Sequence, residues 1–385
     1  MLVADDAAFS SLVAELAEVD AYALDVEFHG ESTYFPRLAV LQLATPDRVA
    51  VVDATTVDVR ALAAVLDGPG LLVAHAGGQD LQVLHRATGT IPRRMLDTQI
   101  AAGFLGLGSP SLVKLVRELL GARLEKAARM TDWFSRPLTD EQVAYAAGDV
   151  AHLLPLRSVM DERLAAAGRR EWAYQESERH RRVREVDVST AWWRLKGARQ
   201  LRGRARGVAQ EVAAWREATA MATDRPARRV LGDEAVLLLA ERPPHSARDL
   251  PRSRLVDWRR TPAPAVQEVL AAVARGVDLP ATDLRLPPDH DLPGHLQPLA
   301  TLLTAWVSQQ SRDLGIDAAL LATRADVEGF LRRVPGASLE RGWRAGLVGS
   351  AMGRIVAGQA AVAADGMGRL VLVDSPPGPA SVPGS

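Results

Sequence analysis

Two carboxylates stand in an otherwise apolar run near the start of the chain, within residues 23–28. In a β-strand, successive side chains point to opposite faces, so Asp25 and Glu27 share one face while the apolar side chains share the other. Two like charges this close repel each other and resist burial unless cations neutralise them. The run therefore indicates either a metal site or an acidic strand face that is exposed to solvent.

A further acid follows the short apolar strand that we predict at residues 71–74. Asp80 comes after a glycine-containing turn and begins a predicted helix, where a carboxylate also simply complements the helix dipole. The turn is no phosphate-binding loop, because no Gly-Lys-Ser or Gly-Lys-Thr sequence follows it. On its own, Asp80 is compatible with a functional or a purely structural role.

A long helix is predicted to begin near residue 140, because Thr139 and Gln142 have the spacing of a capping box. Tyr145 and Asp149 are four residues apart on this helix and therefore project from the same face. The pair fits either a shared functional site or a hydrogen bond at the surface.

Strands and helices must position these residues, and the apolar segments of the sequence indicate where those strands and helices lie. We expect strands at residues 21–28, 38–44 and 49–53 as a β-meander, followed by alternating strands and helices. From about residue 208 onward the pattern is helical throughout. The chain therefore combines an α/β domain with smaller helical domains.

Composition narrows the possible functions. A chain of 385 residues with 48% hydrophobic content is long enough for two or three domains. It contains no cysteine, which excludes disulfides, thiolate metal sites, iron–sulfur clusters and cysteine nucleophiles. The start shows no signal-peptide pattern and no window has the length of a membrane span, so a cytoplasmic location without membrane association is expected.

The net charge of −1 conceals an uneven distribution. Residues 179–229 contain 14 Lys or Arg against 5 Asp or Glu, which is a local excess of nine positive charges. Such a segment suits either a nucleic-acid partner or a solvated linker. Within it, tryptophans stand beside arginines, a combination that can stack bases and bind phosphates or can simply pack. The candidate RNA-binding residues are Trp192, Trp193, Arg199, Arg202, Arg204 and Arg206.

The acids and the tyrosine occur in the order of the three exonuclease motifs of the DEDD superfamily. The motifs read Leu24-Asp25-Val26-Glu27-Phe28, His75-Ala76-Gly77-Gly78-Gln79-Asp80-Leu81 and Tyr145-Ala146-Ala147-Gly148-Asp149-Val150. The position that holds histidine in the other subclass is Ala144, so the chain resembles the tyrosine subclass. More narrowly it resembles ribonuclease D, through the further segments Thr33-Tyr34-Phe35-Pro36-Arg37-Leu38, Leu41-Gln42-Leu43, Asp97-Thr98-Gln99-Ile100, Thr131-Asp132-Trp133 and Arg136-Pro137-Leu138-Thr139.

This resemblance implies an RNase H-like mixed sheet with flanking helices, plus two small all-α HRDC-type domains. The expected limits are an exonuclease domain at 1–170, a basic helical linker at 171–202, an HRDC domain at 203–282, a divergent HRDC-like domain at 283–374 and a disordered tail at 375–385.

The resemblance also implies a function, namely metal-dependent hydrolysis of RNA from its 3′ end to 5′-mononucleotides. Two Mg²⁺ or Mn²⁺ ions would be held by Asp25, Glu27, Asp80 and Asp149, with Asp25 bridging the two, while Tyr145 would orient the attacking water. Four carboxylates and no soft ligand suit such hard cations. The expected substrates are tRNA precursors or other small structured RNAs, and a monomer is expected. The alternatives are a DNA 3′→5′ exonuclease of the same superfamily and a non-catalytic RNA-binding protein.

Overall fold

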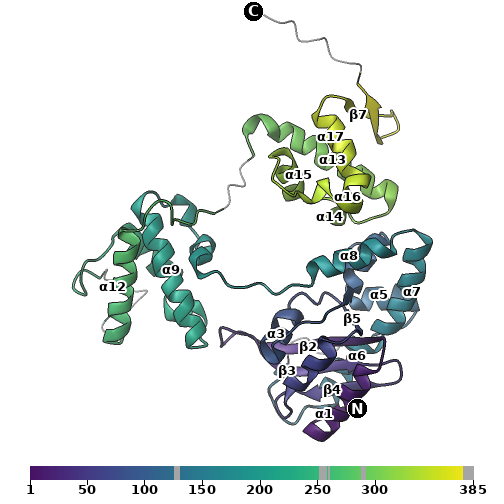
Figure 1. Cartoon of the computed structure of the whole chain (residues 1–385), viewed down its shortest axis with the longest axis horizontal. Helices are drawn as coiled ribbons and strands as arrows, with labels where there is room; N and C mark the ends of the chain where they lie inside the picture. Colours follow the sequence, from purple (N-terminus) through teal and green to yellow (C-terminus); the bar gives the residue numbers. More distant parts are fainter. Residues whose placement is uncertain (125–130, 251–257, 259–260, 288–291, 376–385) are drawn as a thin grey trace, which may run out of the picture. The chain divides into compact units, whose positions relative to one another are not determined.

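The computed structural model describes residues 1–124, 131–250, 258, 261–287 and 292–375 (Figure 1). The chain forms two compact units. The first consists of Met1–Val26, Val40–Arg182 and His290–Ser385, and the second of Glu27–Ala39 and Val183–Asp289. Apart from Ser375, the tail that we predict to be disordered lies outside the described residues.

A mixed six-stranded sheet forms the centre of the N-terminal region, in the order β1-β4-β3-β2-β5-β6. β3 and β4 pair antiparallel, whereas β1 with β4, β2 with β5, and β5 with β6 pair parallel. This arrangement confirms the predicted mixed sheet. The strands are β1 (Leu2–Val3), β2 (Ala21–His29), β3 (Arg37–Ala44), β4 (Val49–Asp53), β5 (Leu71–Ala74) and β6 (Met95–Asp97).

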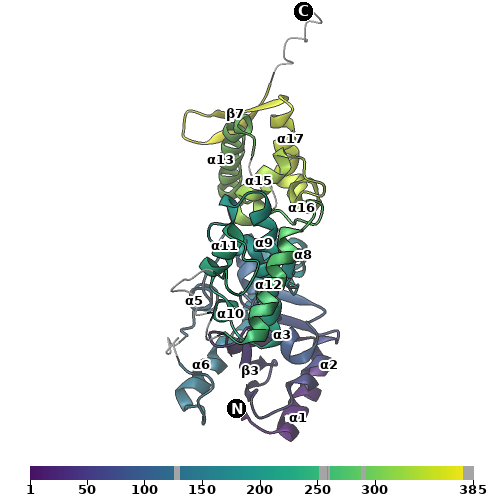
Figure 2. The same ribbon diagram turned by 90° about the vertical axis from the view of Figure 1, so that its left-hand side faces the viewer.

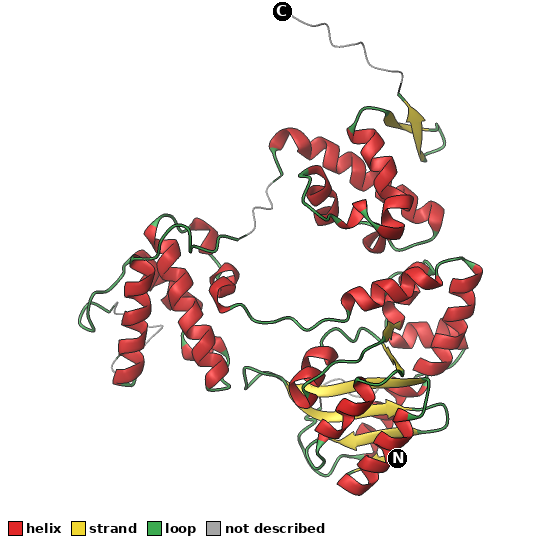
Figure 3. Cartoon of the chain, in the orientation of Figure 1, coloured by secondary structure: helices red, strands yellow, loops and turns green. Residues whose placement is uncertain are grey.

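Helices flank this sheet (Figure 3), and local capping explains where several of them begin. Asp5 caps the first helix, and Thr139 and Gln142 form the predicted capping box at the start of α6. The helices are α1 (Asp6–Ala17), α2 (Ala63–Leu66), α3 (Asp80–Thr88), α4 (Thr98–Phe104), α5 (Leu112–Leu120), α6 (Asp140–Ala151), α7 (Leu153–Ala166) and α8 (Arg170–His180).

The C-terminal helices share the hydrophobic core of the first unit, since Leu156 of α7 and Leu303 of α13 belong to one buried cluster. Polar contacts reinforce this packing, because Asp317 donates its N–H to the Gly103 carbonyl at 2.8 Å. The elements are α13 (Gln297–Leu314), α14 (Ala318–Leu321), α15 (Arg324–Leu331), α16 (Gly342–Arg344), α17 (Ser350–Val356), β7 (Ala360–Ala364) and β8 (Leu370–Asp374). The predicted helices are present, and the β7–β8 hairpin is an addition that the sequence analysis did not predict.

Helices form most of the second unit. Its elements include α9 (Arg204–Ala222), α10 (Ala227–Val230), α11 (Asp233–Glu241) and α12 (Ala263–Val277). The longest two, α9 and α12, lie side by side in both ribbon views (Figures 1 and 2). Their contact needs glycine at Gly207 and Gly276, because a Cβ atom on Gly207 would lie 2.4 Å from the Gly276 carbonyl oxygen.

The predicted basic linker, 171–202, divides between the two units. α8 belongs to the first unit, where Glu176 and Ser177 are buried. The 3₁₀ turn Val188–Arg194 belongs to the second, where Trp192 is part of the hydrophobic core.

The connection between β2 and β3 also belongs to the second unit. The Tyr34 hydroxyl donates a 2.7 Å hydrogen bond to Glu217 of α9, and the backbone N–H groups of Tyr34 and Phe35 donate to Asp224. The strand that carries the first two acids therefore leads directly into a loop fixed by the helical domain. No helix among the described residues is long and apolar enough to cross a membrane.

Candidate active site

The predicted site residues come from three elements of the exonuclease region. Asp25 and Glu27 lie two residues apart on β2 and are both partly buried, as strand alternation predicts. Asp80 is the first residue of α3. The Asp25 and Asp80 carboxyl groups are hydrogen-bonded to each other.

Tyr145 and Asp149 lie on α6, one turn apart, and their side chains are hydrogen-bonded. The charge of Asp25 acts on Asp149, so α6 brings the third motif next to the first. The structure thus brings Asp25 together with Asp80 and Asp149, and Tyr145 with Asp149. Glu27 shares the strand face of Asp25 by alternation alone.

Burial shifts the pKa values of Asp25 and Asp149, and the charge of Asp25 adds to the shift of Asp149. Burial raises the pKa of Asp25 to about 6, although hydrogen bonds from the Val26 backbone and Asp80 oppose the shift. Burial and the negative charge of Asp25 raise the pKa of Asp149 to about 7, opposed by the hydrogen bond from Tyr145. A bound cation would relieve both the desolvation and the repulsion.

The donor set fits a hard divalent cation, because all four acids offer only carboxylate oxygens. Within the described ranges, no three or more His, Asp or Glu side chains are already grouped as a metal site. The support for a cation is therefore the oxygen chemistry and the pairwise repulsion between the acids.

These pKa shifts predict how pH affects the stability of the cation-free protein. The folded state holds the protons of Asp25 and Asp149 more tightly than the unfolded chain, in which both titrate near 3.8. The stability that the protonated forms of Asp25 and Asp149 give the folded state is therefore fully present below pH 4. It is lost as pH rises through about 6 to 7. We expect the melting temperature in EDTA to fall across this range relative to that of an Asp25→Asn/Asp149→Asn variant. Parallel pH profiles of the two proteins would contradict the shifts.

Two buried aspartates that are not among the predicted site residues end strands of the same sheet. Asp53 ends β4 and is 5% exposed, and it binds Arg136 through contacts of 2.5 and 2.7 Å just before α6. Asp97 ends β6 and is also 5% exposed. Each acid is the last residue of an otherwise apolar strand. An acid at the end of an apolar run was the feature of the sequence from which these two residues could have been identified.

The candidate RNA-binding residues differ in exposure. Trp192 is 1% exposed and donates its indole N–H to the Arg285 carbonyl at 3.0 Å, so it packs in the core. Trp193 donates to the same carbonyl at 2.7 Å but is only partly buried. Of the two tryptophans, Trp193 is therefore the better candidate for stacking on a base. Arg199, Arg202 and Arg204 are exposed and Arg206 is partly buried, and within the part of the chain that is described no ion pair involves these four.

Two known protein families match separate parts of this chain. Residues 1–165 match the family of 3′-5′ exonucleases, and residues 205–261 match the HRDC domain. The first match contains every predicted catalytic residue, and the second contains α10, α11 and all of α9 except Arg204.

Relatives extend over the whole length. Ribonuclease D of Acidiphilium cryptum is 33% identical over 389 residues, covering 98% of this chain and 97% of that protein. Ribonuclease D of Nitrobacter hamburgensis is 34% identical, covering 97% and 99%. Among solved structures, RNase D of Escherichia coli, an exoribonuclease involved in structured RNA processing, has a TM-score of 0.78 at 28% identity and covers 93% of this chain and 98% of that one.

Proposed function

The chain belongs to the ribonuclease D family and is a 3′→5′ exoribonuclease, and we propose from this premise that Asp25, Glu27, Asp80 and Asp149 hold the divalent cations for its hydrolysis. The observation that carries the proposal is that Asp25 on β2 interacts with Asp80 of α3 and with Asp149 of α6, with the pKa of Asp25 raised by burial and that of Asp149 raised by burial and by the charge of Asp25.

Two Mg²⁺ or Mn²⁺ ions bound here would supply an activated water and stabilise the leaving 3′ oxygen. The protein's own part is to present oxygen ligands from fixed backbone positions. β2 fixes Asp25 and Glu27 along one strand, while α3 and α6 bring Asp80 and Asp149. Asp25 would be the central ligand of this set, because it is hydrogen-bonded to Asp80 and its charge acts on Asp149.

Tyr145 has a positioning task in this scheme. A phenol has an ordinary pKa near 10, so at neutral pH Tyr145 is a hydrogen-bond donor rather than a base. Its side chain is hydrogen-bonded to Asp149, one of the proposed cation ligands. We propose that it orients the attacking water there.

For the substrate we propose the 3′ ends of tRNA precursors or other small structured RNAs. The basic segment supports this choice, because its exposed arginines can bind phosphates outside the acid cluster. RNase D of Escherichia coli, a structural neighbour that is involved in structured RNA processing, agrees with this choice.

The decisive experiment is digestion of 3′-labelled precursor tRNA and matched 3′-labelled DNA by the purified protein, with Mg²⁺, Mn²⁺ or EDTA. We expect release of labelled 5′-mononucleotide from RNA with either metal, and none in EDTA. Preferred digestion of DNA would favour the DNA exonuclease alternative, and RNA binding without hydrolysis under every condition would favour the non-catalytic one.

The basic segment gives a prediction of its own. Replacing Arg202, Arg204 and Arg206 with alanine should weaken RNA binding and lower the slope of log affinity against log salt by about 2, since each single-strand phosphate contact contributes about 0.7. Filter binding at several salt concentrations measures this slope. Alanine at Arg60, Arg354 and Arg369 removes the same charge from exposed positions elsewhere and should leave the slope unchanged. Equal slopes for both triple variants would assign the segment to a solvated linker.

A further inference from the structure

Asp97 ends β6 and caps α4, and its buried carboxylate accepts three backbone hydrogen bonds. Oδ1 accepts from the N–H of Gln99 at 2.9 Å, inside its own cap, and from Ala76 at 3.0 Å. Oδ2 accepts from the N–H of Gly77 at 3.1 Å. Two of the three bonds therefore reach across to the turn that precedes α3, which lies within the second exonuclease motif.

The turn that Asp97 holds is one that the chain would not adopt without support. Ala76 has a φ of +58°, in the left-handed region, which is unfavourable for a residue other than glycine. At Gly77, a Cβ atom would lie 3.0 Å from both Ala74 Cβ and Met95 Cε, so the backbone is pressed against the sheet. The two hydrogen bonds to Asp97 offset this strain.

The same turn determines where Asp80 lies. The N–H of Leu81 donates to the Gly77 carbonyl at 3.2 Å, so Gly77 belongs to the first turn of α3. Asp80 Oδ2 lies 3.6 Å from the position that a Cβ atom on Gly77 would take. A shift of Gly77 therefore shifts the Asp80 carboxylate directly.

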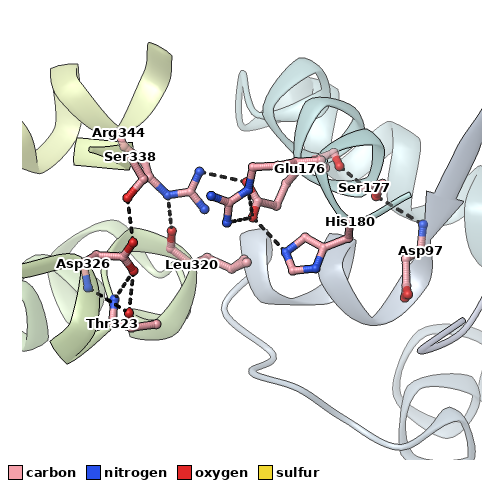
Figure 4. A network of polar contacts seen from close by, with 11 residues as sticks. Asp97, Glu176, Ser177, His180, Leu320, Thr323, Asp326, Ser338 and Arg344 are labelled. Atoms are coloured by element: carbon pink, nitrogen blue, oxygen red, sulfur yellow. Dashed lines mark hydrogen bonds and ion pairs between the residues drawn. The ribbon is translucent and has the colours of Figure 1, made fainter. Parts of the chain in front are cut away.

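Further hydrogen bonds hold the backbone around Asp97 in place, so we expect Asp97 not to follow a movement of residues 76–77. Its N–H donates to Ser177 Oγ on α8 at 3.1 Å, a contact that Figure 4 shows at the right of the network. The next residue, Thr98, donates from Oγ1 to the Ala74 carbonyl at 2.9 Å. Asp97 and Thr98 therefore connect the sheet and α8 to the turn that the Asp97 carboxylate binds.

We propose that Asp97 is a positioning residue that fixes the Asp80 carboxylate for cation binding through its hydrogen bonds to Ala76 and Gly77. The proposal rests on the cation-binding role proposed for Asp80. The Asp97-Thr98-Gln99 segment has no role in the catalytic scheme proposed above, and this proposal gives it one.

The test is Asp97→Asn. In either orientation, the amide places an N–H donor where the carboxylate now accepts a backbone N–H, so at least one of the three bonds is lost. We expect kcat for 3′-labelled RNA to fall roughly ten- to a hundredfold with little change in KM, as for other residues that orient metal ligands. Calorimetric titration with Mn²⁺ in the absence of RNA should show weaker binding by a similar factor.

Two further variants separate positioning from general destabilisation. Asp326→Asn alters another helix-capping carboxylate, in α15, and should lower the melting temperature without changing kcat or Mn²⁺ affinity. Ala76→Gly removes the cost of the left-handed turn, so adding it to Asp97→Asn should restore part of the lost Mn²⁺ affinity and kcat.

A double-mutant cycle with Asp80→Asn distinguishes failure of this inference from failure of the proposed function. If Asp97 acts through Asp80, the double variant binds Mn²⁺ no more weakly than Asp80→Asn alone. Wild-type kcat and Mn²⁺ affinity in Asp97→Asn, fully additive losses, or no restoration by Ala76→Gly would overturn the positioning role. Wild-type Mn²⁺ affinity in Asp80→Asn would instead overturn the proposed role of Asp80 itself.

Discussion

Asp25→Asn and Asp149→Asn are each expected to abolish RNA hydrolysis while leaving the fold intact. Each change removes a charged ligand from the proposed cation site, and metal-bound charge stabilisation is worth several kcal/mol in the transition state. That energy corresponds to a loss in kcat on the order of a thousandfold or more. Release of labelled mononucleotide from 3′-labelled RNA, followed over a long incubation, measures it.

The control for these variants is their stability without cations. Because burial raises the pKa of Asp25, and burial and the charge of Asp25 raise that of Asp149, an uncharged amide at either position should leave the protein in EDTA at pH 8 as stable as the wild type, or more stable. Loss of activity with retained or increased melting temperature identifies a chemical role. Full activity in either purified variant would refute the assignment of the site.

Local pattern made much of the fold and site predictable. Alternation within residues 21–28 placed Asp25 and Glu27 on one strand face, and the structure has β2 there. The capping box at Thr139 located the start of α6 and hence put Tyr145 and Asp149 one turn apart. These predictions succeed because the helix and strand periods and the capping residues act over a few positions.

The approach of distant residues could not be predicted in this way. Nothing in the local sequence says that Asp97 reaches back to Ala76 and Gly77, because that contact depends on the parallel pairing of β5 with β6. Exposure is also decided by tertiary packing, since the adjacent residues Trp192 and Trp193 differ in burial although both bond the same carbonyl.

The C-terminal helices present a further contact that only the structure reveals. Arg344, between α15 and α17, donates to Glu176 of α8 at 2.8 Å, and both side chains are buried (Figure 4). Burial alone would raise the pKa of Glu176, but hydrogen bonds from His180 and Arg344 and the charges of Arg344 and Arg179 lower it to about 2. The stability that this ionised carboxylate contributes is present above its ordinary pKa of 4.5 and is lost as pH falls toward 2.

Arg344→Met is therefore expected to lower the free energy of unfolding of the first unit by about 3 kcal/mol at pH 7, because it leaves a buried carboxylate short of a partner. Urea titration followed by near-ultraviolet circular dichroism reports on this contact, since Trp172 and Trp343 stack beside it with ring centroids 5.7 Å apart. Arg354→Met breaks an exposed pair with Asp374 in the same region and should cost less than about 1 kcal/mol. Adding Glu176→Gln to Arg344→Met should recover part of the loss, because no uncompensated charge then remains buried. Equal costs for Arg344→Met and Arg354→Met would show that the buried pair contributes no more than a surface pair.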